Sequence, residues 1–420
     1  MMTRLPIVWL VGVVAPLVAC NGDGAVLPNV ELVEPPYAPL AGGTEVIVHG
    51  SGFVAGSAAP NRVFVGGREA VLVRMIEDTQ LGVVIPPGDE PGDVEVVVLN
   101  RNGNTAQRGV LRYSTPPEIT DVSPTRVRYD LRATTITLHG SGFRDEDAGV
   151  VAVLVDGQLA SDVMISSDTE LTFTAPPGRA LVWPEITVVD ARGTATTSRG
   201  FRYAPSDHDG LLLFPSFGSW FAVFVDPVSM EIVPIPRINN STLRLTAVVR
   251  DDRGDYWGFD RSQRFGRIDP STQMLDSPVL VDTIIPAATR VGSDYLGIDR
   301  LGARLGRVDL ATGMFTQLAN APVPCCGSFS LATLDGTVLF TARSSGSIVL
   351  NTVDPKTGEH GAGVTLSGPP NLHIEDMRAF AGALYAITRN GLLVTIDPVT
   401  GTTTTLPITP GRASAMDVFE

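Results

Sequence analysis

The chain has 420 residues, which is enough for two to four domains that each bury an apolar core. Its formal charge of −14 at pH 7, with no visible basic cluster, excludes a protein that binds nucleic acid by neutralising phosphates. Hydrophobic residues make up 44% and charged residues 18%, and the 43 Gly and 32 Pro are scattered along the chain. This composition is typical of a globular protein with many short strands and tight turns.

The first predicted element is a secretion signal over residues 1–19. Arg4 precedes an apolar run that has the length of a signal-peptide core and is short for a membrane-spanning helix. The run ends in Leu17-Val-Ala-Cys20, which resembles the bacterial lipobox. That resemblance implies cleavage before Cys20 and attachment of lipid to its sulfur, with residues 20–28 as a tether. The alternatives are an ordinary secretion signal and an uncleaved anchor, in which Cys20 is incidental.

Asn21 follows Cys20, and under the enterobacterial sorting rule a residue other than Asp at this position resembles a signal for outer-membrane delivery. We therefore expect a lipid-anchored protein of the bacterial cell envelope. The outer membrane is the favoured location, and the protein faces either the periplasm or the cell surface. No later segment is apolar for 18 residues, so the sequence predicts no other membrane-spanning segment.

Two further cysteines, Cys325 and Cys326, are adjacent in the sequence. In an oxidising envelope they can form a vicinal disulfide, which strains the peptide between them, or they can remain as two unpaired thiols. The cysteines and the five histidines do not have the spacing of a zinc site, so we expect no bound metal.

A duplication with a period of 90 residues organises the next part of the chain. The segment Val46-Ile-Val-His-Gly-Ser-Gly-Phe53 aligns without a gap with Ile136-Thr-Leu-His-Gly-Ser-Gly-Phe143, and Tyr113 aligns with Tyr203. A repeat of this kind indicates two copies of one independently folding module.

We place the two modules at residues 29–115 and 116–204. Each contains six or seven short strands, separated by turn signals at regular spacing. This pattern predicts an immunoglobulin-like β-sandwich, and the modules lack the Cys pair of antibody domains.

The motifs of the first module also resemble a known family. Gly-Gly-Thr44, an apolar strand, Gly-Ser-Gly-Phe53, Val-Gly-Gly67 and Pro-Pro-Gly88 follow one another in the order typical of the IPT/TIG domain. The second module departs from this order, because Arg132-Ala-Thr-Thr135 replaces Gly-Gly-Thr. The resemblance implies an Ig-like fold and a spacer or binding role, and it carries no catalytic residues.

A weaker repeat, with a spacing of 40 to 45 residues, fills residues 205–420. Each unit has an apolar strand followed by an Asp turn, and these turns begin at Asp226, Asp269, Asp309, Asp354 and Asp397. In such a turn the carboxylate caps backbone amides, a following Pro presets φ, and Gly supplies a positive φ before the return strand. Units of this length with three or four strands are typical of β-propeller blades.

We favour five blades, with six or seven as alternatives. The segment Ala413–Phe419 resembles a blade's opening strand, Ile374–Phe380, and the first unit starts one strand late. We therefore expect the last strand to complete the first blade and close the ring. The strand-and-turn signature resembles quinoprotein-like, lyase-like and YncE-like bacterial propellers. Thr402–Thr405 stands where quinoprotein repeats usually carry a Trp, so we expect no quinone and no other cofactor.

Catalysis by such a propeller would need paired carboxylates at the channel mouth, as in polysaccharide hydrolysis. Six carboxylates lie near the predicted inner strands: Asp209, Asp251, Asp294, Asp335, Glu375 and Asp376. The competing interpretation is that these are turn and loop carboxylates without a catalytic role.

The expected protein is therefore all-β, with two tandem Ig-like sandwiches followed by a β-propeller. We expect the two sandwiches to act as a stalk, and the propeller to bind an envelope or extracellular protein or glycan without chemistry. The alternative is an envelope hydrolase or lyase that acts on polysaccharide at the channel mouth.

Overall fold

The computed structural model describes the following residues: 26–54, 60–105, 108–130, 134–144, 148–215, 220–238, 243–300, 304–318, 329–344, 346–369 and 372–420. The expected signal segment, Cys20, Cys325 and Cys326 lie outside these ranges. The described residues form strands and turns and contain no α-helix, so the all-β prediction is confirmed. Within these ranges, no helix has the length and apolar character needed to cross a membrane.

The first module is a sandwich of two sheets. One sheet has the order β1-β3-β7-β6, and the other has the order β2-β10-β8-β4-β5 with β9 beside β8. The strands are β1 (Asn29–Glu34), β2 (Tyr37–Pro39), β3 (Glu45–Ser51), β4 (Arg62–Val65), β5 (Arg68–Glu69), β6 (Leu72–Glu77), β7 (Gln80–Val84), β8 (Gly92–Asn100), β9 (Gly103–Asn104) and β10 (Gly109–Ser114). Alternate residues such as Val46 and Val48 on β3, and Val96 and Val98 on β8, are fully buried in the core. This period of two is the alternating apolar pattern of the sequence.

The second module repeats this arrangement. Its sheets have the orders β11-β13-β17-β16 and β15-β14-β18-β19, and β12 pairs with β20 in a separate two-stranded sheet. The strands are β11 (Glu118–Ser123), β12 (Arg126–Arg128), β13 (Thr135–Ser141), β14 (Ala152–Val155), β15 (Gln158–Leu159), β16 (Ser161–Ser167), β17 (Glu170–Thr174), β18 (Glu185–Asp190), β19 (Gly193–Ser198) and β20 (Arg202–Ala204).

The repeated Pro-Pro-Gly motif packs against the repeated tyrosine. The Tyr113 hydroxyl donates a hydrogen bond to the Pro86 carbonyl at 2.7 Å, and Tyr203 does the same to Pro176 at 2.6 Å. A Cβ atom on Gly88 would lie 2.8 Å from the Tyr113 ring, so only glycine fits beneath that ring. The duplicated motif therefore has a packing explanation.

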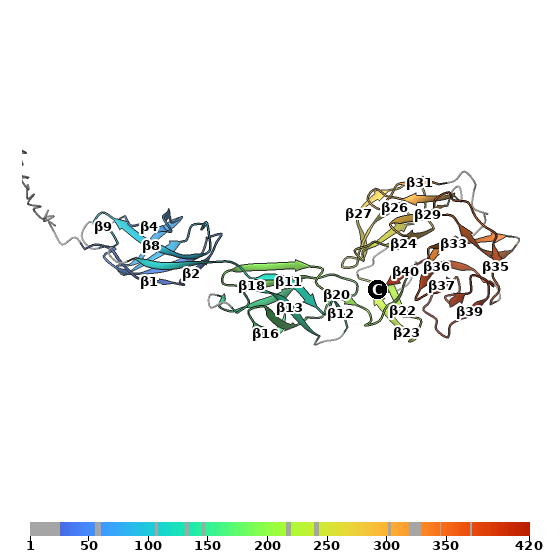
Figure 1. The fold of residues 1–420 in the computed structure, drawn as a ribbon, viewed down its shortest axis with the longest axis horizontal. Coiled ribbons are helices and arrows are strands. Elements are labelled where there is room, and N and C mark those ends of the chain that lie inside the picture. The colour runs from blue at the N-terminus through green and yellow to red at the C-terminus, as the bar shows by residue number, and fades with distance from the viewer. Residues whose placement is uncertain are drawn as a thin grey trace, which may run out of the picture.

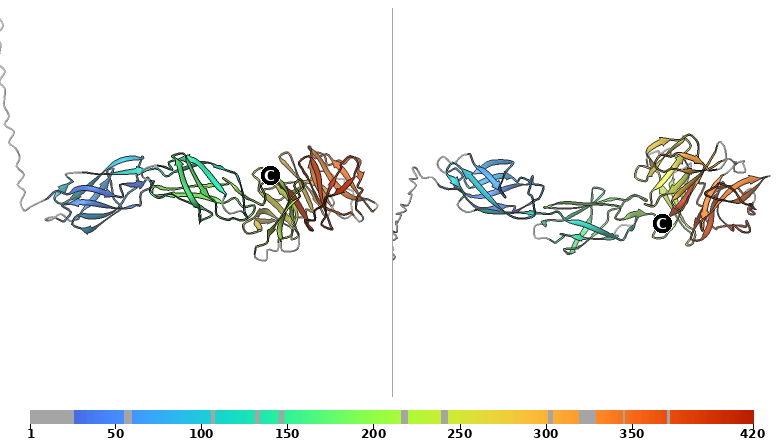
Figure 2. Two further views of the ribbon diagram at one scale, coloured as in Figure 1. Left: turned by 90° about the horizontal axis from the view of Figure 1, so that it is seen from below. Right: turned by 45° about the horizontal axis from the view of Figure 1, so that its top comes forward.

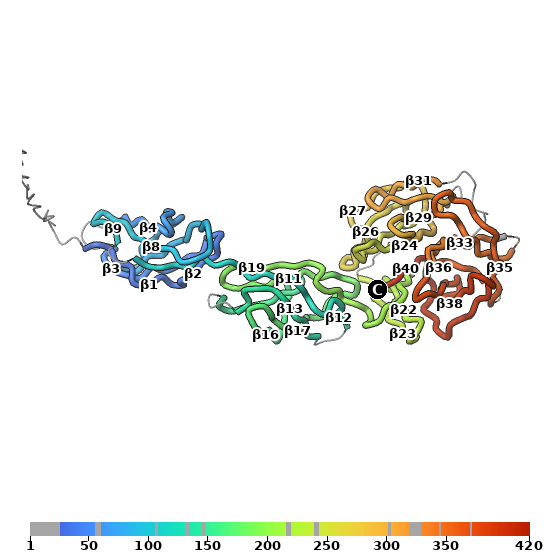
Figure 3. Tube along the Cα trace, viewed as in Figure 1, coloured from blue at the N-terminus to red at the C-terminus, as the bar shows by residue number. Residues whose placement is uncertain are grey.

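Five four-stranded sheets follow, and the innermost strand of each contacts the innermost strands of its two neighbours in a closed ring (Figures 1 and 3). From the innermost strand outward, the first sheet has β40 (Ala415–Phe419), β21 (Gly210–Phe214), β22 (Trp220–Asp226) and β23 (Glu231–Pro236). The second has β24 (Leu245–Arg250), β25 (Tyr256–Asp260), β26 (Arg264–Asp269) and β27 (Met274–Leu280). The third has β28 (Ala287–Val291), β29 (Asp294–Asp299), β30 (Arg304–Val308) and β31 (Phe315–Gln317).

The fourth sheet has β32 (Ser330–Leu334), β33 (Thr337–Ser344), β34 (Ser347–Val353) and β35 (Val364–Thr365). The fifth has β36 (Ile374–Phe380), β37 (Ala383–Thr388), β38 (Leu393–Ile396) and β39 (Thr403–Thr405). Apolar clusters fill the spaces between neighbouring sheets, as expected for blades that pack face to face.

The last strand completes the first sheet, as the sequence predicted. β40 pairs antiparallel with β21, with Gly210 opposite Phe419 and Phe214 opposite Ala415. Both edges of β21 are thereby paired, because β22 occupies the other side. This pairing removes an inner sheet edge that would otherwise be open to other chains.

The predicted Asp turns have the expected hydrogen bonds. The Asp354 carboxylate accepts the backbone amides of Lys356 and Thr357 at 2.6 and 3.1 Å, and these bonds lower the pKa of Asp354. Each turn follows the third strand of its sheet and reaches a residue with positive φ four positions after the Asp: Met230, Gln273, Gly313, Gly358 and Gly401. Turn chemistry therefore sets the repeat that the sequence displays.

The two sandwiches and the ring lie roughly in line, with the first module at the end farthest from the ring (Figures 1 and 2). The end of β40 lies on the side of the ring that faces the second module (Figure 1).

Deleting Arg412–Glu420 removes β40 and should open the ring. We expect the thermal midpoint of the ring to fall by at least ~10 °C, because loss of a partner from a buried ion pair alone costs ~3–5 kcal/mol. We also expect association through the exposed edge of β21. Calorimetry and size-exclusion chromatography measure both effects, with Thr404→Ala in the outermost strand β39 as the control. A truncated protein that stays monomeric and melts with its parent would contradict this account of ring closure.

Candidate functional site

Three of the six candidate carboxylates are exposed at the surface. Asp209 precedes β21 and forms an ion pair with Arg126 of the second module at 2.6 Å. Asp294 begins β29 and pairs with Arg307 at 3.4 Å. Asp335 is an exposed residue of the turn between β32 and β33. Two of these side chains thus form ion pairs, and the third lies in a turn.

Two more candidate carboxylates, Asp251 and Glu375, bind groups close to them in the fold. Asp251 closes the turn after β24, where it accepts the backbone amides of Arg253 and Asp255, each at 2.9 Å, and the Trp257 indole N–H at 3.0 Å. Glu375 forms an ion pair with Arg389 at 2.7 Å.

Asp376 is the one candidate that is fully buried. It accepts the backbone amides of Met377 and of Met416, on the neighbouring strand β40, at 2.9 and 2.8 Å. Burial raises the pKa of Asp376 to about 6, against the opposing effects of the Arg378 charge and these two amides. A raised carboxyl pKa is a known mark of functional sites, and it also occurs in structural ion-pair networks.

Arg378 occupies the channel of the ring and explains the burial of Asp376. Its guanidinium donates to the carbonyls of Leu331 on β32 and Val248 on β24, at 2.9 and 2.7 Å. It also forms ion pairs with the carboxylates of Asp376 at 3.1 Å and Asp417 at 3.3 Å. One side chain on β36 thus binds three other innermost strands: β24, β32 and β40.

The sequence analysis did not identify Arg378 or Asp417. A signal was present, because the opening strands 374–380 and 413–419 align Met377 with Met416 and Arg378 with Asp417. Opposite charges at matching positions of two similar opening strands indicate a charged pair between them.

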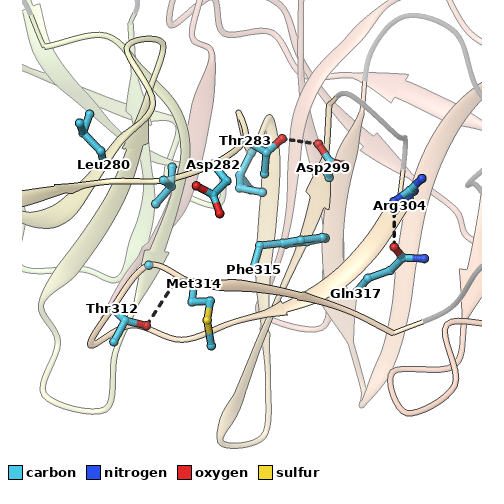
Figure 4. A pocket seen from close by; sticks show the side chains of 12 residues that line it. Leu280, Asp282, Thr283, Asp299, Arg304, Thr312, Met314, Phe315 and Gln317 are labelled. Atoms are coloured by element: carbon cyan, nitrogen blue, oxygen red, sulfur yellow. Dashed lines mark hydrogen bonds between the residues drawn. The ribbon is translucent and has the colours of Figure 1, made fainter.

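A groove of about 750 Å³ lies at the outer rim of the ring, between the second and third sheets. Phe315 lies in the middle of this groove, with Met314 and Thr312 on one side and the Arg304–Gln317 pair on the other (Figure 4). The Arg304 guanidinium donates to the Gln317 side-chain oxygen at 3.0 Å.

The groove combines an apolar centre with polar ends. Leu280 and Met314 are 81% and 62% exposed, so apolar surface at its rim is open to solvent. Thr283 donates a hydrogen bond to Asp299, and Asp282 is exposed nearby (Figure 4). Ligand-binding pockets are typically apolar with a small number of placed polar groups, and this groove has that composition.

Within the described ranges, no three His, Cys, Asp or Glu side chains gather closely enough to hold a metal ion. Cys325 and Cys326, the expected disulfide pair, and Cys20, the expected lipidation site, lie outside those ranges.

Two stretches of the chain match a known family. Residues 28–113 and 117–203 each match the family model described as the IPT/TIG domain. The chain contains two IPT/TIG domains. Plexin-B1 from Homo sapiens is 31% identical to this chain over 100 residues, which are 24% of this chain and 5% of that protein. The chain therefore spans only a small part of this relative's length.

Solved structures give weaker likenesses. An auxiliary nutrient binding protein from Bacteroides ovatus is 15% identical, with a TM-score of 0.31 over 90% of this chain and 86% of that one. A nidogen/laminin complex is 10% identical, with a TM-score of 0.37 over 50% of this chain and 98% of that one.

The second IPT/TIG domain meets the ring at Arg202. The centre of the Arg202 guanidinium lies 5.5, 5.2 and 5.1 Å from the ring centroids of Trp183, Tyr256 and Phe419. Arg202 is buried, and this burial lowers its pKa below the ordinary value. Aromatic faces attract a desolvated cation, so the three rings compensate part of the cost of burying its charge.

The duplication shows what distinguishes this contact. In the first IPT/TIG domain the position of Arg202 is Arg112, and the position of Trp183 is Asp93. Arg112 and Asp93 form an exposed ion pair at 2.7 Å. The arginine is thus present in both copies, while its partner changes from a carboxylate to an indole. Leu181 of the second copy also joins an apolar cluster with residues of the ring.

Polar contacts surround this aromatic site. Arg199 forms an ion pair with Asp255, and Arg128 pairs with Glu231 at 3.3 Å. The Tyr256 hydroxyl donates to the carbonyl of Val418 at 2.9 Å. The second IPT/TIG domain therefore docks beside β40, the strand that closes the ring.

Replacing Arg202 with alanine should weaken this docking. We expect the unfolding free energy of the ring and the second IPT/TIG domain to fall by ~2–4 kcal/mol, because three aromatic rings lose the cation that they contact and a cavity is left behind. Arg112→Ala is the matched control, and loss of its exposed ion pair should cost ~1 kcal/mol or less. Calorimetry on both variants measures the difference. Equal effects at the two positions would show that the aromatic site contributes nothing to stability.

Proposed function

We propose that this protein is a lipid-anchored, non-enzymatic binding protein of the bacterial cell envelope. Its two IPT/TIG domains act as a stalk, and its propeller presents a site for an envelope or extracellular protein or glycan. The propeller would be of the quinoprotein-like or YncE-like class that its strand-and-turn signature resembles. The linear arrangement of the domains supports the stalk role, because it carries the ring away from the expected anchor (Figure 2).

The observation that carries this proposal is the groove beside Phe315. A protein or glycan surface could cover the exposed side chains of Leu280 and Met314, while Asp282, Arg304 and other polar groups at the ends provide hydrogen bonds. Exposed apolar side chains that surround a groove are a common feature of recognition surfaces.

The alternative, a hydrolase or lyase at the channel mouth, needs two carboxylates that face a substrate across ~5–10 Å. Asp376 and Asp417 are near the channel, but both contact the same guanidinium of Arg378. Asp251 is held by its own turn. These engagements favour binding over chemistry.

The lipid anchor at Cys20 is the second part of the proposal, with the outer membrane as the favoured destination. Lipid chains on one cysteine would hold the chain stably at a bilayer. The net charge of −14 supports an envelope or extracellular partner over nucleic acid.

The groove is tested by a screen of the full-length protein, in mild detergent, against an array of bacterial and host glycans and against extracellular proteins. We expect a ligand whose binding weakens at least ~10-fold in Phe315→Ala, since central aromatic residues often cost ~2 kcal/mol or more when truncated. The double variant Asp282→Ala/Arg304→Ala, which changes two exposed side chains, should also weaken it. Trp220→Ala is the control, because Trp220 is exposed on another sheet. A ligand unaffected by both groove variants would place the binding site elsewhere.

The anchor is tested by Cys20→Ser in a bacterial host. We expect the parent to incorporate labelled palmitate and to sediment with membranes, and the variant to remain unlabelled and to lose stable membrane attachment. Cys325→Ser is the control, because its thiol is not part of the lipobox motif. Label in the Cys20→Ser variant would reject lipidation at this residue.

A further inference from the structure

A second cavity, of about 180 Å³, lies in the mouth of the ring's channel and is separate from the groove. All five innermost strands contribute to its wall, including Arg250 on β24, Thr289 on β28, Thr333 on β32, Arg378 on β36 and Asp417 on β40. The cavity has about six times the volume that one molecule occupies in liquid water, so it can hold more than a single water.

Two opposite charges at this cavity are incompletely satisfied. Asp417 is 8% exposed, and its Oδ1 contacts the Arg378 guanidinium and the Val418 amide. Its Oδ2 is buried and has no hydrogen-bond partner among the described residues. The Nε–H of Arg250 is also buried without a partner there, although its other nitrogens bind Glu420. Both residues line the cavity, and each has one polar atom without a hydrogen-bond partner among the described residues.

Unpaired buried groups of this kind are costly, so their chemistry indicates what the cavity would bind. The complement of a buried carboxylate oxygen is a cationic donor, and the complement of a buried guanidinium N–H is an anionic acceptor. Thr289 and Thr333, whose hydroxyl oxygens lie 3.2 Å apart, add further acceptors for a group with several N–H donors.

The other charges at the mouth already have partners. Arg290 pairs with Asp252 and donates to the Gly292 carbonyl, and Asp251 accepts the amides of its own turn. Asp417 pairs with Arg378 and Arg250 pairs with Glu420, but one atom of each side chain, Oδ2 of Asp417 and Nε of Arg250, has no hydrogen-bond partner among the described residues.

We infer that the channel mouth is a binding site for a free α-amino acid, with its ammonium group at Asp417, Thr289 and Thr333 and its carboxylate at Arg250. An α-amino acid carries both charged groups on one carbon atom, and a small side chain fits the cavity volume. Burial raises the pKa of Asp417, and a bound ammonium group would lower it again. Because β40 supplies Asp417, the site exists only in the closed ring.

Calorimetric titration of the full-length protein with glycine, L-alanine and L-serine tests this inference. Three probes each carry a single feature of the proposed ligand or of a neutral solute. Methylammonium carries only the cation, acetate only the anion, and glycerol only neutral hydroxyl groups. We expect at least one amino acid to bind and to raise the thermal midpoint, and each single-feature probe to bind at least 10-fold more weakly. Asp417→Asn should weaken the amino acid at least 10-fold, while Asp335→Asn, on an exposed turn, should leave binding unchanged.

Thr333→Val provides a second variant in case Asp417→Asn disturbs the ring, and it should weaken the same amino acid several-fold. A cavity that holds water only would show no heat and no thermal shift with any amino acid at millimolar concentration, and would overturn the inference. Equal binding of methylammonium and glycine would also overturn it. Neither result bears on the groove beside Phe315, because that site has its own residues and its own test.

Discussion

Arg378 places a positive charge in the middle of a ring of β-sheets, where bulk water does not reach. A buried guanidinium has to find acceptors within the protein, and here they come from β24, β32, β36 and β40. Burying the two carboxylates beside it also costs free energy, since burial raises the pKa of both Asp376 and Asp417. The arrangement is satisfied only when the innermost strands stand in their ring positions, so this network specifies the closed architecture.

The same constraint extends to the rest of the molecule through β40. This strand pairs with β21, supplies Asp417 to the channel, and places Phe419 against Arg202 of the second IPT/TIG domain. Ring closure and the docking of the neighbouring domain therefore share one element. The groove beside Phe315 lies between the second and third sheets and does not include β40, so the groove and the internal network use different residues.

The sequence predicted the features that depend on local chemistry. The Asp turns were visible because a carboxylate, its capped amides and a residue of positive φ lie within five positions. The equivalence of Tyr113 and Tyr203 was visible because the duplication repeats this residue. The closing strand was visible because Ala413–Phe419 looks like the other opening strands. In each case the determining residues are adjacent in sequence or occur twice.

What escaped prediction depends on register and on partners distant in sequence. Glu375 and Asp376 are neighbours with the same charge, yet one is paired near the surface and the other is buried. The pairing of β36 with β37 shifts register between Ile374 and Asp376, and sequence alone does not reveal such a shift. Trp183 escaped prediction for a related reason. It contacts Arg202 beside Tyr256 and Phe419 of the propeller, and these two residues are distant from it in sequence.

The first sheet also has consequences for the order in which the protein folds. β21 is buried along its whole length, but its inner partner β40 comes from the other end of the ring's sequence. Contacts between such distant segments form late and slowly, because the entropy of closing the intervening loop must be lost first. The four intervening sheets have local pairings and can form earlier, so the nascent ring would pass through an incomplete intermediate in which the inner edge of β21 is unpaired. A chaperone would have the most effect on the yield of folded protein while that intermediate is present.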